Sequence, residues 1–321
     1  MESDRTHRRR ARARSSRLRP LLYTAVASAV IVGGTAAGTA YVKAQAHADD
    51  GPVSSSASPS TSASASEESS VEPVVRPTVD RDALLAGAMA SVTVEDGADV
   101  AVSVFDPDSG ESAGYGEGTF DTASIVKVDI LATLLLQAQD ADRHLTAQER
   151  SYATAMIENS DNDSATALWT AIGEADGLDA ANKRFGLTGT AGGDGALWGL
   201  TQTTAADQLT LLRQVFGDDS KLSAASRTYL QGLMSRIVED QHWGVSAAAT
   251  DSGTGWALKN GWLARSSTGL WDINSIGRVT VDGHDYLVAA LSHGNTTKAK
   301  GISLVESAAE AAVSAFSTSG D

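Results

Sequence analysis

The sequence predicts an α+β domain in which one antiparallel sheet packs against helices. Two observations carry this prediction. The segments with regular apolar spacing run in the order helix, strand, several helices, three strands and a final helix, and Asp282-Gly283 between the last two strands is a plausible hairpin turn. The chain of 321 residues, 42% of them hydrophobic, can also bury one sizeable core and still leave non-globular ends.

The elements follow from their periodicity. Apolar residues three or four apart predict helices, and alternation predicts strands. A helix over 124–138 matters most, because its apolar stripe leaves Ser124 at its N-terminus and Lys127 one turn further on the same face. The other helices are expected at 81–92, 146–158, 164–171, 178–185, 204–216, 223–237 and 299–316, and the strands at 100–105, 256–263, 270–281 and 286–293.

The N-terminal 48 residues are typical of an export segment. Eight Arg in residues 1–20 precede an uncharged run of 22 residues, 21–42, which ends at Lys43. Since positive charge stays on the cytoplasmic side, the chain after Lys43 is expected outside the cytoplasm. The run is long enough to span a bilayer as an anchor. Small residues at 44–48 also allow cleavage as a signal peptide, and both readings stay open.

Residues 49–78 are expected to form a disordered linker. They consist mainly of Ser, Ala, Pro and Glu, and they carry too little apolar surface to offset the entropy of ordering. The globular domain is therefore placed at 79–321.

The charge distribution limits the classes of partner. The formal net charge is -15, and residues 1–20 contribute about +6, so the remainder is strongly acidic. A nucleic-acid partner is disfavoured, because binding phosphates requires a basic face. With no Cys, disulfides and thiolate catalysis are excluded.

Three short motifs occur in order along the predicted domain. They are Ser124-Ile125-Val126-Lys127 at a helix start, Ser160-Asp161-Asn162 between two helices, and Lys259-Asn260-Gly261 in a strand. Each has an ordinary structural explanation, since Ser, Asp and Asn cap helices well and S-x-x-K strings arise by chance in a Ser-rich chain. Together, each on a suitable element, they indicate a serine nucleophile beside a lysine.

From about residue 80 onward the chain resembles the class A β-lactamases and penicillin-binding proteins, whose signature these motifs match. The resemblance implies a serine hydrolase with an all-helical subdomain beside the sheet. It implies that Ser124 attacks a carbonyl, that Lys127 helps to deprotonate Ser124, and that Ser160 passes a proton to the leaving nitrogen.

The same resemblance implies the substrate-binding residues. Lys259 would bind a substrate carboxylate and Asn162 would hold a substrate amide. The backbone N–H groups of Ser124 and of Trp262, which follows Gly261, would form the oxyanion hole. Asn260 stands where the family has Thr or Ser, so its amide is expected to meet the carboxylate.

Two further departures bear on the chemistry. Lys127 and Ser160 are closer in sequence than in class A enzymes, which predicts a more open site. The family's motif with a deacylating Glu has no match between Gly173 and Thr203, so an acyl-enzyme is expected to persist. Asp194 could substitute as the base, although an Asp among glycines is more often a turn residue.

The sequence therefore predicts an exported serine hydrolase, acylated at Ser124 by β-lactams or peptidoglycan-like amides and slow to deacylate. The alternative is a catalytically weak module of the same fold that binds a cell-wall peptide. The six His show no paired metal spacing, so neither a metal nor a cofactor is expected. The expected partners are a small β-lactam or a cell-wall peptide, with membrane contact through the N-terminal segment if it is uncleaved, and the protein is expected to be a monomer.

Overall fold

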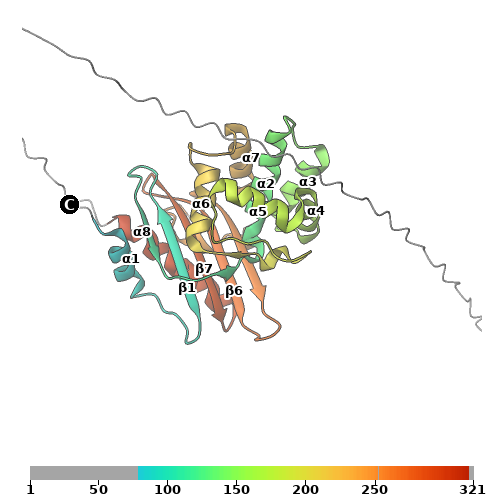
Figure 1. Ribbon diagram of the computed structural model, residues 1–321. Helices are drawn as coiled ribbons and strands as arrows, with labels where there is room; N and C mark the ends of the chain where they lie inside the picture. Colours follow the sequence, from blue (N-terminus) through green and yellow to red (C-terminus); the bar gives the residue numbers. More distant parts are fainter. Residues whose placement is uncertain (1–78, 252, 318–321) are drawn as a thin grey trace, which may run out of the picture. The chain divides into compact units, whose positions relative to one another are not determined.

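The computed structural model describes residues 79–251 and 253–317. In this part the fold is α+β, as the sequence predicts (Figure 1). The strands are β1 (Asp99–Phe105), β2 (Ser112–Tyr115), β3 (Phe120–Asp121), β4 (Gln202–Thr203), β5 (Trp256–Ala264), β6 (Trp271–Val281) and β7 (His284–Asn295). The helices are α1 (Arg81–Met89), α2 (Val126–Asp140), α3 (Ala147–Glu158), α4 (Asn162–Ile172), α5 (Glu174–Phe185), α6 (Ala205–Phe216), α7 (Ala224–Met234) and α8 (Lys298–Ser317).

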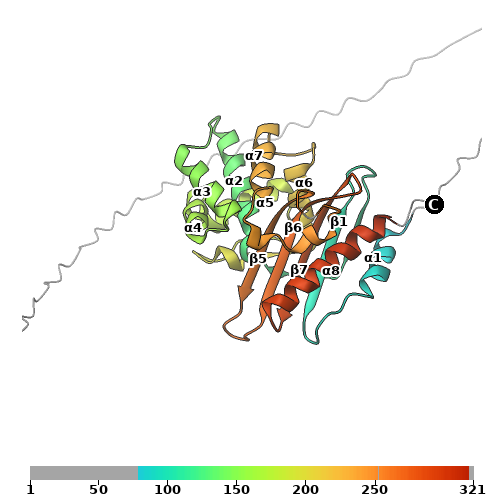
Figure 2. The same ribbon diagram turned by 180° about the vertical axis from the view of Figure 1, so that it is seen from behind.

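The main sheet has five antiparallel strands in the order β2-β1-β7-β6-β5. Helices α1 and α8 cover one face, which is the nearer face in Figure 2. Helix α6 packs on the other face, beside the group formed by α2, α3, α4, α5 and α7. The expected antiparallel sheet and helical subdomain are both confirmed.

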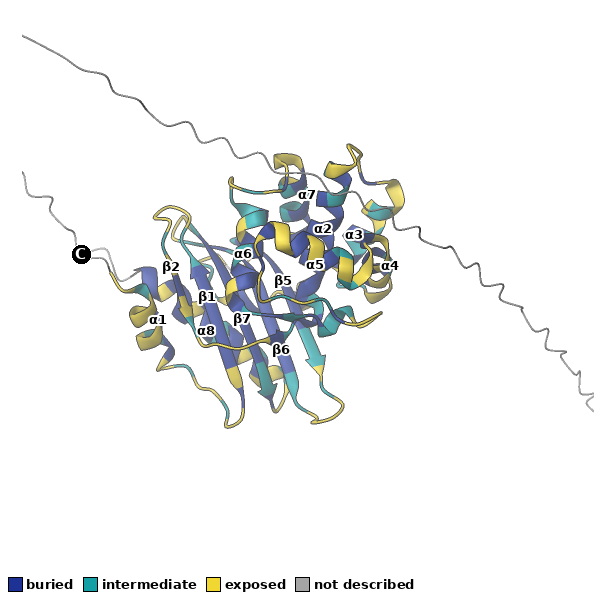
Figure 3. Cartoon of the chain, viewed as in Figure 1, coloured by how far each residue is buried: buried dark blue, intermediate teal, exposed yellow. Residues whose placement is uncertain are grey.

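The sheet is buried on both faces, and the sequences of its central strands are therefore mostly apolar. In β7, Leu287, Ala289 and Leu291 pack into the apolar cluster of the helical subdomain, whereas Val288 and Ala290 pack toward α8. This alternation is the period of two along a strand. Because both faces are covered, the strand is a nearly continuous apolar run and appears almost entirely buried in Figure 3.

Helix boundaries follow capping residues. Thr146 and Glu149 form a reciprocal capping box at the start of α3, and Thr204 and Ser223 cap α6 and α7 with their hydroxyls. Helix α5 begins at Glu174, four residues before the predicted start. The chain turns at Gly173 in the left-handed conformation and resumes the helix at once.

The hairpin between β6 and β7 is confirmed, with φ of 51° at Asp282 and 88° at Gly283. The short strands β2, β3 and β4 are absent from the predicted elements, because runs of two to four residues carry too little periodicity to be detected.

The predicted export segment and linker lie outside the described residues. Within the described part of the chain, no helix combines the length and the apolar character needed to cross a bilayer.

Gly277, in the middle of β6, offers a test of how tightly the sheet is packed. A Cβ there would lie 2.5 Å from the Ala257 carbonyl oxygen and 2.7 Å from Leu258 Cβ. Neither backbone can move away cheaply. We expect Gly277→Ala to lower the free energy of unfolding by about 2 kcal/mol in urea denaturation. As a control, Gly87→Ala in α1 adds a Cβ with nothing within 4 Å and should raise it by roughly 0.5 kcal/mol. Equal effects of the two changes would contradict this packing.

Candidate functional site

The three motifs meet where the helical subdomain contacts the edge strand β5. Ser124 lies in a 3-10 turn, η1 (Ala123–Ile125), directly before α2, and Ser160 lies in the short connection between α3 and α4. β5 packs against η1. Residues more than one hundred positions apart in the sequence are thereby brought into one cluster.

Ser124 is half-buried at the entrance to α2. The predicted helix start at Ser124 is corrected slightly: the regular helix begins at Val126, and Ser124 occupies the tighter turn before it. The preceding residue, Ala123, has φ of 47°, a left-handed conformation that is costly for a residue with a Cβ. The positive end of the α2 dipole still lies beside the serine, where it would stabilise developing negative charge.

Lys127 is fully buried, and its ammonium group is surrounded by oxygen acceptors. Nζ donates to the Ser160 carbonyl oxygen at 2.7 Å, to Ser160 Oγ at 3.0 Å and to Asn162 Oδ1 at 2.8 Å. Burial lowers the pKa of Lys127 from its ordinary value to about 7, and the charge of Asp161 acts in the opposite direction. Lys127 is therefore able to exist as a free base near neutral pH.

Ser160 Oγ lies between two lysines. Besides Lys127, it accepts a hydrogen bond from Lys259 Nζ at 3.1 Å. Lys259 is also fully buried, and burial lowers its pKa well below the ordinary value, with the charge of Lys127 adding to the effect. Gln241 Oε1 lies 3.5 Å from Lys259 Nζ and supplies a neutral acceptor.

The backbone of the second motif explains its side-chain directions. Ser160 has φ of 56°, and Asp161 caps α4 by accepting a hydrogen bond from Ser164 N at 2.7 Å. Asp161 thus has the backbone-binding role expected of it. Asn162 is the first residue of α4; its oxygen is held by Lys127, so its amide hydrogens are the part that can meet a substrate.

Gly261 allows β5 to approach the nucleophile. A Cβ at this position would lie 2.7 Å from the Thr122 carbonyl oxygen and 2.8 Å from Ser124 N. Only a glycine permits this approach, which brings the β5 backbone up to the amide of Ser124. The Trp262 side chain lies on the other face, with its ring centroid 6.0 Å from that of Trp243. Any role of Trp262 in an oxyanion hole is therefore through its backbone, as the sequence predicts.

The predicted role of Asn260 is wrong. Asn260 is fully buried, and its two amide hydrogens are taken by the carbonyl oxygens of Gln241 at 2.8 Å and of Trp243 at 2.9 Å. It has no amide hydrogen left for a substrate carboxylate. The reason is the strand period: Lys259 and Gly261 face the site, so Asn260 faces the opposite side.

Trp198 is the residue of the site that the sequence does not identify. It lies in the 3-10 turn η2 (Trp198–Leu200), and the centroid of one of its rings is 4.9 Å from Lys127 Nζ. This turn lies within residues 173–203, where the sequence has no match to the family's Glu-containing motif. Asp194, the substitute base considered above, is exposed, and its carbonyl accepts a turn hydrogen bond from Leu197 N at 3.0 Å.

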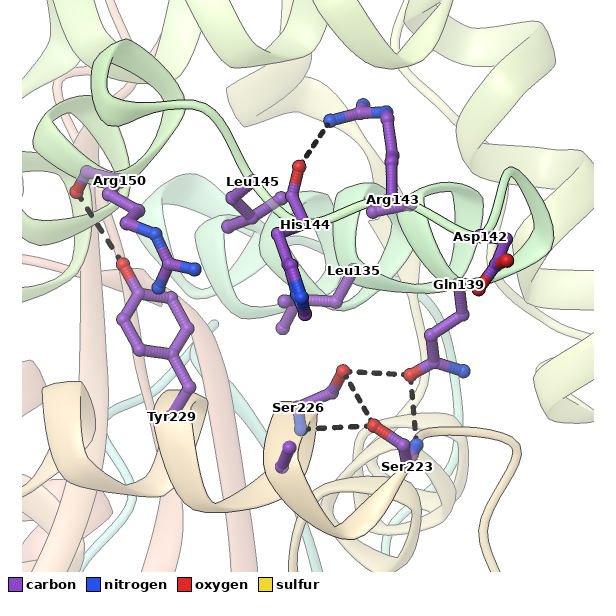
Figure 4. A pocket seen from close by; sticks show the side chains of 12 residues that line it. Leu135, Gln139, Asp142, Arg143, His144, Leu145, Arg150, Ser223, Ser226 and Tyr229 are labelled. Atoms are coloured by element: carbon purple, nitrogen blue, oxygen red, sulfur yellow. Dashed lines mark hydrogen bonds between the residues drawn. The ribbon is translucent and has the colours of Figure 1, made fainter.

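A hollow elsewhere on the surface contains none of the predicted site residues. A cavity of about 380 Å³ lies between the end of α2, the start of α3 and α7, with Arg150 and Tyr229 on one side and Ser223 and Ser226 on the other (Figure 4). This cavity is therefore separate from the cluster formed by the three motifs. Over residues 79–251 and 253–317, no group of three or more acidic, His or Cys side chains is arranged to hold a metal ion.

The structural role of Asn260 can be tested directly. We expect Asn260→Ala to lower the free energy of unfolding by about 2 kcal/mol or more, because two buried carbonyl groups lose their donors. Asn159→Ala, at the exposed end of α3, is the control and should change it by less than about 0.5 kcal/mol. Urea unfolding measures both. Unchanged stability of Asn260→Ala together with weakened penicillin binding would restore the substrate-binding role.

The sequence matches the model of a known family. The model of the β-lactamase enzyme family matches residues 143–316, more than half of the chain, in a range that begins after Ser124 and Lys127. No curated protein matches the sequence.

Solved structures share the fold. PBP-A is 22% identical with a TM-score of 0.62, over 73% of this chain and 96% of its own. The TLA-1 extended-spectrum β-lactamase is 13% identical with a TM-score of 0.63, over 74% and 98%. A β-lactamase from Xanthomonas campestris is 21% identical with a TM-score of 0.57, over 72% and 95%. The family match, supported by this common fold, shows that the chain belongs to the β-lactamase enzyme family.

Proposed function

We propose that this protein is an exported serine hydrolase that is acylated on Ser124 by β-lactams or by peptidoglycan-like amides, and that releases the acyl group slowly. The observation that carries the proposal is the hydroxyl of Ser160 held between the Nζ atoms of Lys127 and Lys259. A site that only bound a peptide would have no use for a lysine with a pKa of about 7 beside a serine.

In the acylation step, the free base of Lys127 accepts the hydroxyl proton of Ser124, and Ser124 Oγ attacks the carbonyl carbon of the amide. The negative charge passes to the carbonyl oxygen, to which the backbone N–H groups of Ser124 and Trp262 would donate hydrogen bonds. The close approach of β5 at Gly261 supports this pairing of donors.

The departing nitrogen must then gain a proton. Ser160 Oγ contacts Lys127, so the proton taken from Ser124 can pass from Lys127 through the Ser160 hydroxyl to the leaving nitrogen as the C–N bond breaks. Lys259 would bind the substrate carboxylate. The arrival of that negative charge raises the pKa of Lys259, so the ligand itself favours the ammonium form that attracts it.

Slow release is proposed because the family's motif with a deacylating Glu has no match between Gly173 and Thr203. The stretch that corresponds to the family's Glu motif places the apolar ring of Trp198 against Lys127. A point mutant of PBP-A, 20% identical with a TM-score of 0.61 over 73% of this chain and 96% of its own, was solved as an acyl-enzyme complex with penicillin G. Such a complex in a protein of the same fold supports acylation as the observable event.

Export and a monomeric state are also proposed, and the sequence supports export. The Arg-rich start, the uncharged run at 21–42 and the Ser-rich linker at 49–78 would hold the domain outside the cytoplasm, either on the membrane or released from it.

Acylation is tested by intact-protein mass spectrometry after incubation with a penicillin. We expect the mass to increase by one penicillin in the natural sequence and not to change in Ser124→Ala, while Ser314→Ala, a serine on α8, keeps the adduct. With nitrocefin, the protein should give a burst of about one equivalent and little turnover. If a peptide binds but no adduct forms at any pH, the binding-module alternative replaces the enzyme.

Export is tested by adding protease to intact cells that express the full chain. We expect digestion of the domain from residue 79 onward under conditions in which a cytoplasmic marker protein survives. Protection of the domain until the cells are lysed is the outcome that rules out export.

A further inference from the structure

We propose that Trp198 is a positioning residue that shields the Lys127 amine from water and thereby keeps Lys127 in the free-base form that accepts the Ser124 proton. This inference rests on the proposed function and deepens it. Trp198 would be the residue that allows Lys127 to act as a base at neutral pH.

The first support is the geometry around Lys127 Nζ. Nζ lies within hydrogen-bond distance of two oxygens of Ser160 and one of Asn162. A ring of Trp198 lies against the same nitrogen, with the ring centroid 4.9 Å away. Lys127 is 0% exposed, although the neighbouring Ser124 and Ser160 are only half-buried. The indole is therefore part of what separates this amine from solvent.

The second support is that Trp198 is held in place by the residues it adjoins. Its Nε1 donates to Thr166 Oγ1 at 3.1 Å, and Thr166 in turn donates to the Asn162 carbonyl oxygen at 3.0 Å. The η2 turn also contacts the η1 turn that carries Ser124. Trp198 thus connects the nucleophile's turn to α4, whose first residue binds Lys127.

The Trp198 ring has two opposing effects on the pKa of Lys127. The face of an aromatic ring attracts a cation and so favours the charged amine. Burial disfavours it, because the ammonium loses its hydration. We infer that burial is the larger effect, because the ring covers Nζ and burial is the main cause that lowers the pKa of Lys127 to about 7. Removing the ring is therefore expected to raise the proton affinity of Lys127.

The acylation rate should depend on the fraction of Lys127 that is in the free-base form. In the natural sequence, the acylation rate should rise with pH through about 7 as Lys127 loses its proton. In Trp198→Ala, water reaches Nζ, and the rise should move to higher pH by roughly one to two pH units. At pH 7 the acylation rate constant should then fall by about five- to fiftyfold, and it should recover at high pH.

The experiment measures the pH dependence of acylation in the full-length protein and in three variants, with a fluorescent penicillin as the probe. Trp198→Phe keeps an aromatic cover and loses only the Thr166 hydrogen bond, so its midpoint should stay near that of the natural sequence. Trp198→Leu keeps part of the cover and should lie between Phe and Ala. If one variant does not fold, the order of the other two midpoints still tests the proposal. Midpoints that do not follow it, or an Ala midpoint equal to the natural one, would overturn the proposal.

A second measurement separates this proposal from the proposed function. In protein labelled with ¹³C at lysine Cε, the Lys127 resonance, assigned by its loss in Lys127→Met, reports the proton directly and needs no acylation. If no penicillin labels the natural protein yet the Lys127 titration moves upward in Trp198→Ala, the acylation hypothesis fails and the role of Trp198 stands. An unmoved Lys127 titration in Trp198→Ala contradicts the role of Trp198, whether or not Ser124 is acylated.

Discussion

The burial of two lysine side chains around one serine hydroxyl is the constraint on which the site depends. Lys127 and Lys259 both donate to Ser160 Oγ, and both are inaccessible to solvent. In the described part of the chain, Asp161 is the one carboxylate whose charge supports the ammonium form of Lys127. Burial with so little compensation lowers the pKa of both lysines, and the charge of Lys127 lowers that of Lys259 further.

The fold serves this arrangement through a few close contacts. Helix α2 is buried on nearly all sides in the subdomain core, with Lys127 in its first turn and Ser124 in the turn before it. Gly261 then lets β5 reach the turn before α2, which places Lys259 opposite Lys127. Ala123, which precedes Ser124, and Ser160 at the centre of the cluster both have left-handed backbone conformations. Backbone conformations of this kind persist only where the surrounding packing holds them, which fits a site built in advance of its ligand.

Much of this could be predicted from the sequence, for physical reasons that differ between elements. Long helices and strands show their periods, and Thr146, Thr204 and Ser223 mark helix starts because their hydroxyls satisfy free N–H groups. Lys259 was predicted to face the site. Asn260 was assigned by analogy of residue type, and the alternation along β5 overrides that analogy: a residue next to Lys259 in a regular strand points to the other face, where its amide secures two backbone carbonyls.

Trp198 shows where reading the sequence reaches its limit. The sequence around Trp198 shows only that the family's Glu motif is missing. No motif predicts that the tryptophan lies over Lys127. Its position depends on a 3-10 turn, on Thr166 one turn into α4 and on the contact between two short loops, none of which has a period. In the proposed function, the indole of Trp198 keeps water away from Lys127 Nζ, and the missing Glu motif leaves the acyl group without that base. Both features would favour forming an acyl-enzyme over hydrolysing it.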